Sequence, residues 1–446
     1  MSQLAADRGR HRHRQGHTLP GAVAHAEAGL DAHAPALLAG FRRALPVATD
    51  TVNRRLLGAL VREQLTGAPA TRARPARRHG FGRVEFDDVP AAEPADLLPT
   101  DLDPAAAGSL AVELNNAVVN LAVAMARGPA TGTDAGRTHR HTGTAPTNPD
   151  AGYTDPDAGA LAAERLAVTG HNLHPCGRTR LGWEIPDVLA HDLEAGHTGI
   201  GFVAVRADLH LGDDVMASAL GRAYPDLPTA PAGYRLQPVH RWQRDTVLAR
   251  YADLVHDGRL RRVDGELPAE PTAALRTLLL PPGRDGVRHY LKVSLDIQVT
   301  STRRGISVAA TRNGPILSAL LHRLLADDPD GAAVLLMAEP AGAAVPAGSG
   351  RDLSVIVRTA LTGRLDAREI AVPGGALPAI DPATGGTVVA GLVGAYARSH
   401  ARRDDAAAAL AFLSAYARLL LPPLLRLATG YGVALEAHLQ NCLPTF

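Results

Sequence analysis

The apolar positions in the first 127 residues recur at the spacing of α-helices. One side of a helix over Asn53–Leu65 would carry Leu56, Leu57, Leu60, Val61 and Leu65. A second run, Leu110–Met125, has the same periodicity. These patterns predict a helical N-terminal domain over residues 21–127, preceded by a disordered basic tail over residues 1–20.

The next segment, residues 128–159, has almost no large apolar side chain. It consists mainly of Gly, Thr, Asp, Pro and Ala. Such a composition cannot bury enough apolar surface to offset the entropy lost on ordering. We therefore expect a disordered linker or insertion, with His139 and His141 as solvated loop residues.

From Leu161 to about Met337, short strand patterns alternate with helical ones. Gly201–Arg206 is typical of a strand, and Ile316–Leu325 of a helix that begins just after Pro315. This mixture predicts an α+β domain over residues 160–340, followed by a linker over Ala341–Arg351.

The last part, residues 352–446, shows mainly helical periodicity. Ala406–Leu421 predicts a long helix, and we expect a break or kink at Pro422–Pro423 before a short helix, Leu424–Thr429. We find no internal repeat.

The clearest strand pattern is Tyr290–Ser301, where apolar residues alternate strictly with polar ones. Because side chains alternate across a strand, one polar face would carry Lys292, Ser294, Gln298 and Thr300. Such a face is either a solvated side of an antiparallel sheet or a platform for a ligand.

Composition brings the ligand platform level with the solvated face, and both interpretations stay open. The 46 basic residues comprise 45 arginines and one lysine, Lys292. In a chain that uses Arg for nearly every positive charge, a lone lysine marks a place that suits a compact ammonium better than a planar guanidinium. An ammonium can sit between phosphate oxygens.

The remaining composition excludes several classes of function. The formal net charge is +1, which gives no overall field for nucleic acid or anionic membrane. The two cysteines form neither a disulfide framework nor a metal motif, and no signal peptide is recognisable. We also see no run of about 18 apolar residues. A cytoplasmic protein of roughly two to four domains is expected.

Two further segments concentrate polar groups. Gly170–Gly182 contains His171, His174, Arg178 and Arg180. Two histidines three apart could bind zinc, but no third and fourth ligands follow at suitable spacing, so an anion site fits better. The second segment, Glu436–Asn441, is by itself compatible with an ordinary polar helix end.

Taken together, the three segments resemble the aerobactin-synthetase-like family, the synthetases that make siderophores without a peptide-synthesis template. Family members carry GHPxHPxxKxRxG, KxSLxxxxTS followed by xxRxI, and EAHxQN. The second and third patterns are complete here, from Lys292 to Ile306 and from Glu436 to Asn441. The first has Asn172 for proline and Arg178 for lysine, and Ala274 replaces a serine that usually stands two before Arg276.

The resemblance implies a cupped-hand architecture of thumb, fingers and palm, in which a mainly antiparallel sheet carries the ATP site. Residues 21–127 would form the thumb, 160–340 the fingers and 352–446 the start of the palm. Members activate a carboxylate of citrate or a related acid with ATP, and an amine or hydroxyl captures the acyl-adenylate. This chemistry needs fixed cations and magnesium to neutralise the phosphates.

The resemblance also assigns roles to residues. Lys292 and Arg304 would clamp phosphates, with His171, His174, Arg276 and His438 nearby. Thr300 and Ser301 would contact the nucleotide, and Glu436 would be the Mg²⁺ ligand. The remaining nucleotide-binding candidates are Arg178, Arg180, Ser294, Gln440 and Asn441.

Family members continue well beyond EAHxQN, whereas this sequence stops at Phe446. The expectation is a palm incomplete at its C-terminus, and a chain that binds ATP but is slow alone until a separate C-terminal partner is supplied. The resemblance also allows a homodimer. The main alternative is a truncated nucleotide-binding relative, or a partner subunit, without catalysis of its own. Nucleic-acid binding through the Arg-rich tail is a weaker alternative, and no membrane partner is expected.

Overall fold

The computed structural model describes residues 18–65, 75–89, 91–129, 155–366, 369–401 and 404–446. These residues form two compact units. The first lies within residues 1–130, 168–195 and 297–304, and the second within 131–167, 196–296 and 305–446. Most of the predicted tail and most of the predicted linker fall outside the described residues. Each unit is considered by itself below.

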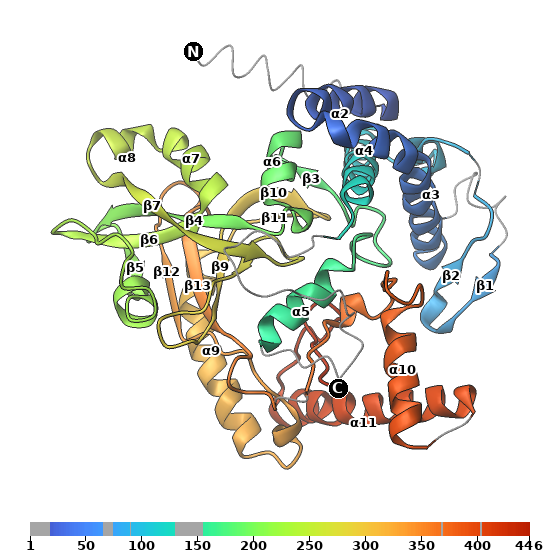
Figure 1. The fold of residues 1–446 in the computed structure, drawn as a ribbon. Helices are drawn as coiled ribbons and strands as arrows, with labels where there is room; N and C mark the ends of the chain where they lie inside the picture. Colours follow the sequence, from blue (N-terminus) through green and yellow to red (C-terminus); the bar gives the residue numbers. More distant parts are fainter. Residues whose placement is uncertain (1–17, 66–74, 90, 130–154, 367–368, 402–403) are drawn as a thin grey trace. The chain divides into compact units, whose positions relative to one another are not determined.

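The first unit is built from long helices (Figure 1). They are α2 (Leu19–His33), α3 (Leu38–Arg62), α4 (Pro104–Arg127) and the shorter α6 (Ile185–His191). The Thr18 and Asp103 side chains cap α2 and α4 by accepting hydrogen bonds from first-turn N–H groups. The predicted helical character of this region is confirmed, although α2 begins inside the segment expected to be tail.

The strands of the first unit are short. β1 (Arg77–Arg78) pairs with β2 (Val84–Glu85), and β3 (Arg180–Leu181) pairs with β10 (Leu295–Val299). β11 (Thr302–Arg304) lies on the other side of β10. The chain enters this unit within β10 and leaves it after Arg304.

The second unit contains an antiparallel eight-stranded sheet in the order β5-β12-β13-β9-β8-β7-β4-β6. The strand bounds are β4 Thr198–Arg206, β5 Leu211–Gly212, β6 Tyr234–His240, β7 Leu260–Pro271, β8 Thr277–Leu279, β9 His289–Val293, β12 Ala341–Ala344 and β13 Ser354–Thr359. Apolar residues from β4, β6, β8, β9, β12 and β13 share one buried cluster. The mixture of helices and antiparallel strands confirms the predicted α+β class.

The second unit also contains helices. They are α5 (Pro156–Arg165), α7 (Arg241–Arg250), α8 (Ala252–His256), α9 (Val308–Ala326), α10 (Val388–Ser399) and α11 (Asp405–Tyr431), with a π-helical turn at Met216–Leu220. α9 packs on β12 and β13 (Figure 1). α5 starts after the cap Asp155, so the final residues of the predicted linker are helical.

The predicted strand Tyr290–Ser301 is two strands, because β9 ends at Val293 and β10 begins at Leu295. Between them, Ser294 is buried. Its N–H donates to Ser354 O at 2.9 Å, and its Oγ accepts from the Ile306 N–H at 3.3 Å. Ser294 therefore fixes the bend between the two strands, and its hydroxyl is engaged within the protein.

The linker expected at Ala341–Arg351 is partly a strand. β12 consists only of Ala and Gly, a composition typical of loops, yet all four residues are buried. Small side chains are needed there because α9 packs directly on β12. The following strand β13 pairs with β9, so the segment expected to start a helical domain contributes to the same sheet.

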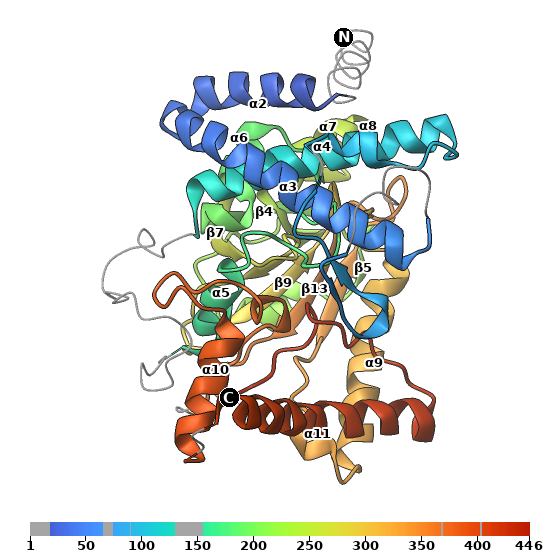
Figure 2. The same cartoon turned by 90° about the vertical axis from the view of Figure 1, so that its right-hand side faces the viewer.

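Prolines interrupt helices less than we expected. α9 begins at Val308 with Ser307 as its cap and contains Pro315, and α11 runs unbroken through Pro422 and Pro423. Figure 2 shows α11 along its length. An interior proline costs about 3 kcal/mol, but buried residues on both sides, Phe412 and Leu427, anchor α11.

Among the described helices, α4 and α11 are long and apolar enough to cross a membrane by length and composition. The expectation that no such run exists is therefore wrong. About 61% of the apolar window of α4 is buried in the structure, as in a core helix, against 17% for α11. Core helices of folded domains meet the same criterion, so these two helices alone do not assign a membrane location.

The approach of α9 to β12 gives a testable constraint. A Cβ at Gly342 would lie 2.4 Å from Thr311 O, closer than side chains pack against backbone. We expect Gly342→Ala to lower the free energy of unfolding by about 1–3 kcal/mol, the cost of overpacking. Urea unfolding measures this, with Gly375→Ala as control because nothing lies within 4 Å of its Cβ position. Equal stability of the two variants would contradict the packing described here.

Candidate functional site

In the first unit, the Gly170–Gly182 segment forms a tight turn that fixes both histidine rings. The Nδ1 atom of His171 accepts from the N–H groups of Leu173 and His174, both at 3.2 Å. The Nδ1 atom of His174 accepts from the Cys176 N–H at 3.0 Å. In a neutral imidazole, an accepting Nδ1 leaves the proton on Nε2. Both rings therefore present Nε2–H donors.

Electrostatics keeps His174 neutral. Burial lowers its pKa, and the positive charges of His171, Arg62, Arg55 and Arg304 lower it further. Donors of this kind suit an anion, whereas zinc would need an Nε2 lone pair. Among the residues that the structure describes, no three His, Cys, Asp or Glu side chains are grouped to hold a metal.

Arg178 and Arg180 are buried in ion pairs within the first unit. Arg180 binds Asp192 through Nε at 2.9 Å and Nη2 at 3.1 Å. Arg178 Nη2 lies 2.6 Å from Glu194 Oε1, and its Nη1 lies 3.9 Å from Asp192 Oδ1. Side chains of these four residues are at most 3% exposed. The two arginines hold the histidine turn in place, and their contacts give no support to the predicted nucleotide binding.

The turn between β10 and β11 carries the other predicted residues of this unit. Thr300 has a φ of 59°, in the left-handed region that a β-branched residue rarely occupies. Arg304 Nη2 donates to Val299 O at 3.1 Å and to Thr300 Oγ1 at 2.9 Å. Burial lowers the pKa of Arg304, as does the charge of Arg180. Ser301 is exposed in the same turn. Backbone strain of this kind is concentrated at binding sites.

In the second unit, Lys292 lies on β9 between Thr277 of β8 and Ile356 of β13. Its Nζ is 3.7 Å from Glu339 Oε1, which also accepts from Arg358 Nη2 at 2.7 Å. Burial lowers the pKa of Lys292, and the charges of Arg358 and Arg276 lower it further, against the opposing effect of Glu339.

Arg276 approaches from the turn before β8. Its Nη1 donates to Gly305 O at 3.3 Å, and its own carbonyl accepts from the Val293 N–H at 2.7 Å. Leu275, just before it, has a φ of 61°. Arg276 and Arg358 thus both lie close enough to act on Lys292, and Glu339 contacts Lys292 and Arg358.

Sequence reasoning missed Glu339 and Arg358. The run of β-branched residues Val355, Ile356 and Val357 could have identified β13 as a strand, but its pairing with β9 depends on long-range structure. No local pattern marks Glu339, which stands in the irregular segment before β12.

The Glu436–Asn441 segment follows α11 as an irregular turn, not a helix end. Asn441 Nδ2 donates to Glu436 O at 2.9 Å and lies 3.1 Å from His438 Nε2. The carbonyls of Leu439 and Cys442 accept from the N–H groups of Gly375 and Gly374. The backbone is therefore held while the side chains of Glu436, His438, Gln440 and Asn441 remain exposed.

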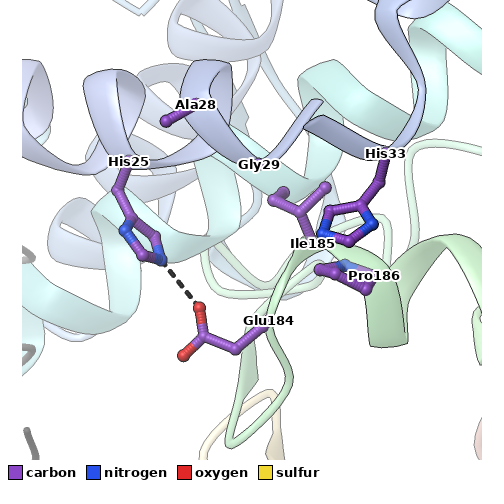
Figure 3. A pocket seen from close by; sticks show the side chains of 7 residues that line it. All are labelled: His25, Ala28, Gly29, His33, Glu184, Ile185 and Pro186. Atoms are coloured by element: carbon purple, nitrogen blue, oxygen red, sulfur yellow. Dashed lines mark hydrogen bonds and ion pairs between the residues drawn. The ribbon is translucent and has the colours of Figure 1, made fainter. Parts of the chain in front are cut away.

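The first unit also has a pocket that contains none of the residues of the histidine turn. Figure 3 shows His25 pointing toward Glu184, at 2.7 Å between Nε2 and Oε2. The other lining residues are Ala28, Gly29, His33, Ile185 and Pro186. No residue predicted from the sequence lines this pocket, so we assign it no part in the proposed chemistry.

Comparison with protein families accounts for the three polar segments. Residues 159–379 match the model of the IucA / IucC family, and this range contains the histidine turn, Lys292 and Arg304. The chain belongs to the IucA / IucC family. A second model, described as a ferric iron reductase FhuF-like transporter, matches residues 410–446, which include the Glu436–Asn441 turn.

Relatives of this IucA / IucC family member include the D-ornithine–citrate ligase of Staphylococcus aureus, 24% identical over 318 residues. That match covers 64% of this chain and 47% of the ligase. The chain spans about half the length of the curated relatives it matches.

Solved structures share the fold. The petrobactin biosynthesis protein AsbB of Bacillus anthracis superposes with a TM-score of 0.70 at 18% identity, over 92% of this chain and 73% of AsbB. The ATP-bound aerobactin synthetase IucA of Klebsiella pneumoniae gives a TM-score of 0.63 at 18% identity, over 84% of this chain and 69% of that one.

The ion pairs under the histidine turn give a pH-dependent prediction for this family member. Burial alone would raise the pKa of Asp192, but Arg180 and Arg178 outweigh it and lower the pKa to about 2. Because the pKa is lower in the folded state, the charged carboxylate stabilises the fold above about pH 4. This stabilisation disappears as the pH falls towards 2.

We expect Asp192→Asn to cost about 3–5 kcal/mol of unfolding free energy at pH 7, because it leaves buried arginine charges uncompensated. The loss of stability between pH 4 and pH 2 should shrink in the variant. Urea unfolding at stepped pH measures both effects, with Asp50→Asn as control since Asp50 forms an exposed pair with Arg54. If Asp192→Asn loses as much unfolding free energy between pH 4 and pH 2 as the wild type, the assigned ion pairs are contradicted.

Proposed function

We propose that this chain is an ATP-dependent siderophore synthetase. It adenylates a carboxylate of citrate or a related polycarboxylic acid, releases pyrophosphate, and passes the acyl group to an amine or hydroxyl. The observation that carries the proposal is the position of the single lysine, among two arginines and one glutamate on an antiparallel sheet. A citrate ligase among its relatives and an ATP-bound aerobactin synthetase among its structural neighbours support it.

The charges around Lys292 suit a polyphosphate. Lys292 and Arg358 bring two positive charges against the one negative charge of Glu339, and the charge of Arg276 also acts on Lys292. The side chains of Lys292 and Arg358 are only 25% and 30% exposed, so their field is less screened than that of surface cations. Fixed cations of this kind stabilise the charge that develops on a departing pyrophosphate without reorganising during the reaction.

The first unit supplies a second set of donors. By the family resemblance, Arg304 binds phosphate and Thr300 and Ser301 contact the nucleotide. The Nε2–H donors of His171 and His174 can bind a carboxylate or phosphate oxygen in the neutral state. Burial lowers the pKa of His174, so this ring can donate a hydrogen bond without adding net charge.

Magnesium and the last segment complete the proposal. Glu436 is an exposed carboxylate, which fits a Mg²⁺ ion that keeps waters and phosphate oxygens as its other ligands. His438, Gln440 and Asn441 in the same turn provide polar groups for the nucleotide. No protein nucleophile is required, because the substrate carboxylate itself attacks the α-phosphate.

The second candidate is a nucleotide-binding protein or partner subunit that does not catalyse condensation by itself. The chain spans about half the length of the curated relatives, so the activity of the whole relatives is a proposal for it. Citrate-like acids, an amine or alcohol, a homodimer partner and a separate C-terminal polypeptide remain proposals for this chain.

Lys292 can be tested directly because it is the only lysine. ATP with Mg²⁺ should protect it from an amine-directed reagent, as mass spectrometry of the labelled peptide would show. Lys292→Ala should weaken ATP binding by about 1.5–3 kcal/mol, the value of hydrogen bonds to charged groups. Lys292→Arg should restore only part of this, because the guanidinium is wider. Arg284→Ala is the control, a 70% exposed cation of the same unit. Full labelling in the presence of ATP would refute the assignment.

Adenylation has its own assay. We expect exchange of pyrophosphate into ATP that requires citrate or a related acid. Lys292→Ala should abolish this exchange, because the positions of the two reactants and the neutralisation of charge both depend on the bound phosphates. Hydroxamate formation with hydroxylamine would report the acyl-adenylate. ATP binding without carboxylate-dependent exchange would favour the second candidate.

A further inference from the structure

Glu339 contacts both cations on neighbouring strands. Its Oε1 atom lies 2.7 Å from Arg358 Nη2 and 3.7 Å from Lys292 Nζ. In the register of β9 and β13, Lys292 pairs with Ile356, and Arg358 stands two residues further along β13. Lys292 and Arg358 therefore lie on the same face of the sheet. One carboxylate oxygen thus bridges two cations that would otherwise repel each other.

The backbone of Glu339 is anchored on both sides. Its N–H donates to Ser318 Oγ of α9 at 2.9 Å, and the preceding carbonyl, that of Ala338, accepts from the Thr359 N–H at 2.8 Å. β12 begins two residues later, at Ala341. Glu339 is therefore tied to α9, β12 and β13 at once.

The carboxylate itself lies against a glycine of α9. A Cβ at Gly314 would be 2.8 Å from Glu339 Oε2, so a larger residue would displace the carboxylate. The Glu339 side chain is only 16% exposed. Such confinement is more than an ordinary surface ion pair requires, since exposed pairs contribute little and hold no fixed geometry.

We propose that Glu339 is the positioning residue of the Lys292 site, holding Lys292 and Arg358 side by side as a paired cationic group for the nucleotide phosphates. The inference rests on the proposed function and deepens it. Glu339 does not touch the phosphates. It sets the direction of the two side chains and favours the protonated ammonium, while Arg276 and Arg358 favour the neutral amine.

The proposal has a direct readout, because the labelling rate of the only lysine reports the fraction of neutral amine. The substitution Glu339→Gln removes the negative charge that favours the ammonium form of Lys292. Labelling of Lys292 at pH 8 without nucleotide should then become about tenfold faster, the effect of removing an opposite charge at this distance. Arg358→Gln should change the rate in the opposite direction, and Glu339→Asp should restore part of the wild-type behaviour.

Gly314→Ala provides a second test that leaves every charge in place. It should increase labelling in the same direction as Glu339→Gln but by less, because it displaces the carboxylate without removing it. Asp226→Asn, at a 97% exposed position of the same unit, is the control and should leave the rate unchanged. Wild-type labelling rates in both Glu339→Gln and Gly314→Ala, with native circular dichroism, would overturn the proposal.

Nucleotide binding separates a positioning role from a merely structural one. The ratio of the ATP dissociation constants of Glu339→Gln and wild type should grow from pH 7 to pH 9, since the variant loses its ammonium at lower pH. A ratio that does not change with pH would also overturn the proposal. If neither protein binds ATP, the proposed function fails, while the labelling experiment still decides the link between Glu339 and Lys292.

Discussion

The pairing of β9 with β8 on one side and β13 on the other is the constraint on which the second unit depends. It buries Leu291 and Val293 in the main apolar cluster of the sheet. The alternation of side chains then leaves Lys292 on the opposite face. A central strand cannot shift its register by one residue without moving every side chain to the wrong face. The position of the single ammonium is therefore determined by the same contacts that form the core.

The protein uses its two kinds of cation differently. Arg178 and Arg180 are almost completely buried. Arg180 donates two hydrogen bonds to Asp192, and Arg178 forms ion pairs with Glu194 and Asp192. There the positive charge is compensated inside the fold. Around Lys292, the single carboxylate of Glu339 contacts both Lys292 and Arg358, which leaves an excess of positive charge for an anion. A compensated cluster orders a turn, and an uncompensated one can bind a ligand.

Local periodicity predicted the elements in which the element's own apolar residues decide which side is buried. The predicted helix Leu110–Met125 lies within α4, and the predicted strand Gly201–Arg206 lies within β4. The alternation around Lys292 belongs to the same class. The family resemblance identified Lys292, Arg304 and the Glu436–Asn441 turn as segments of interest. It could do so because their residue types and spacings are themselves the signal.

The elements that were missed depend on partners distant in the sequence. β12 has the composition of a loop, and only the packing of α9 on its Ala and Gly residues makes it a strand. Glu339 acquires a role only because β13 brings Arg358 next to Lys292. In the same way, Ser294 appeared to belong to a polar face, but its hydroxyl is taken by the Ile306 N–H twelve residues later.

The single lysine on β9 also makes the chain a one-site substrate for a lysine-specific protease. Proteases cleave extended, solvated backbone, whereas the bond after Lys292 lies in a strand paired on both sides. Cleavage there requires β9 to separate from a neighbour, so its rate measures the free energy of that local opening. The rate at which a lysine-specific protease cuts the chain, followed on a gel, would therefore report how often the strand that carries Lys292 opens, without any label.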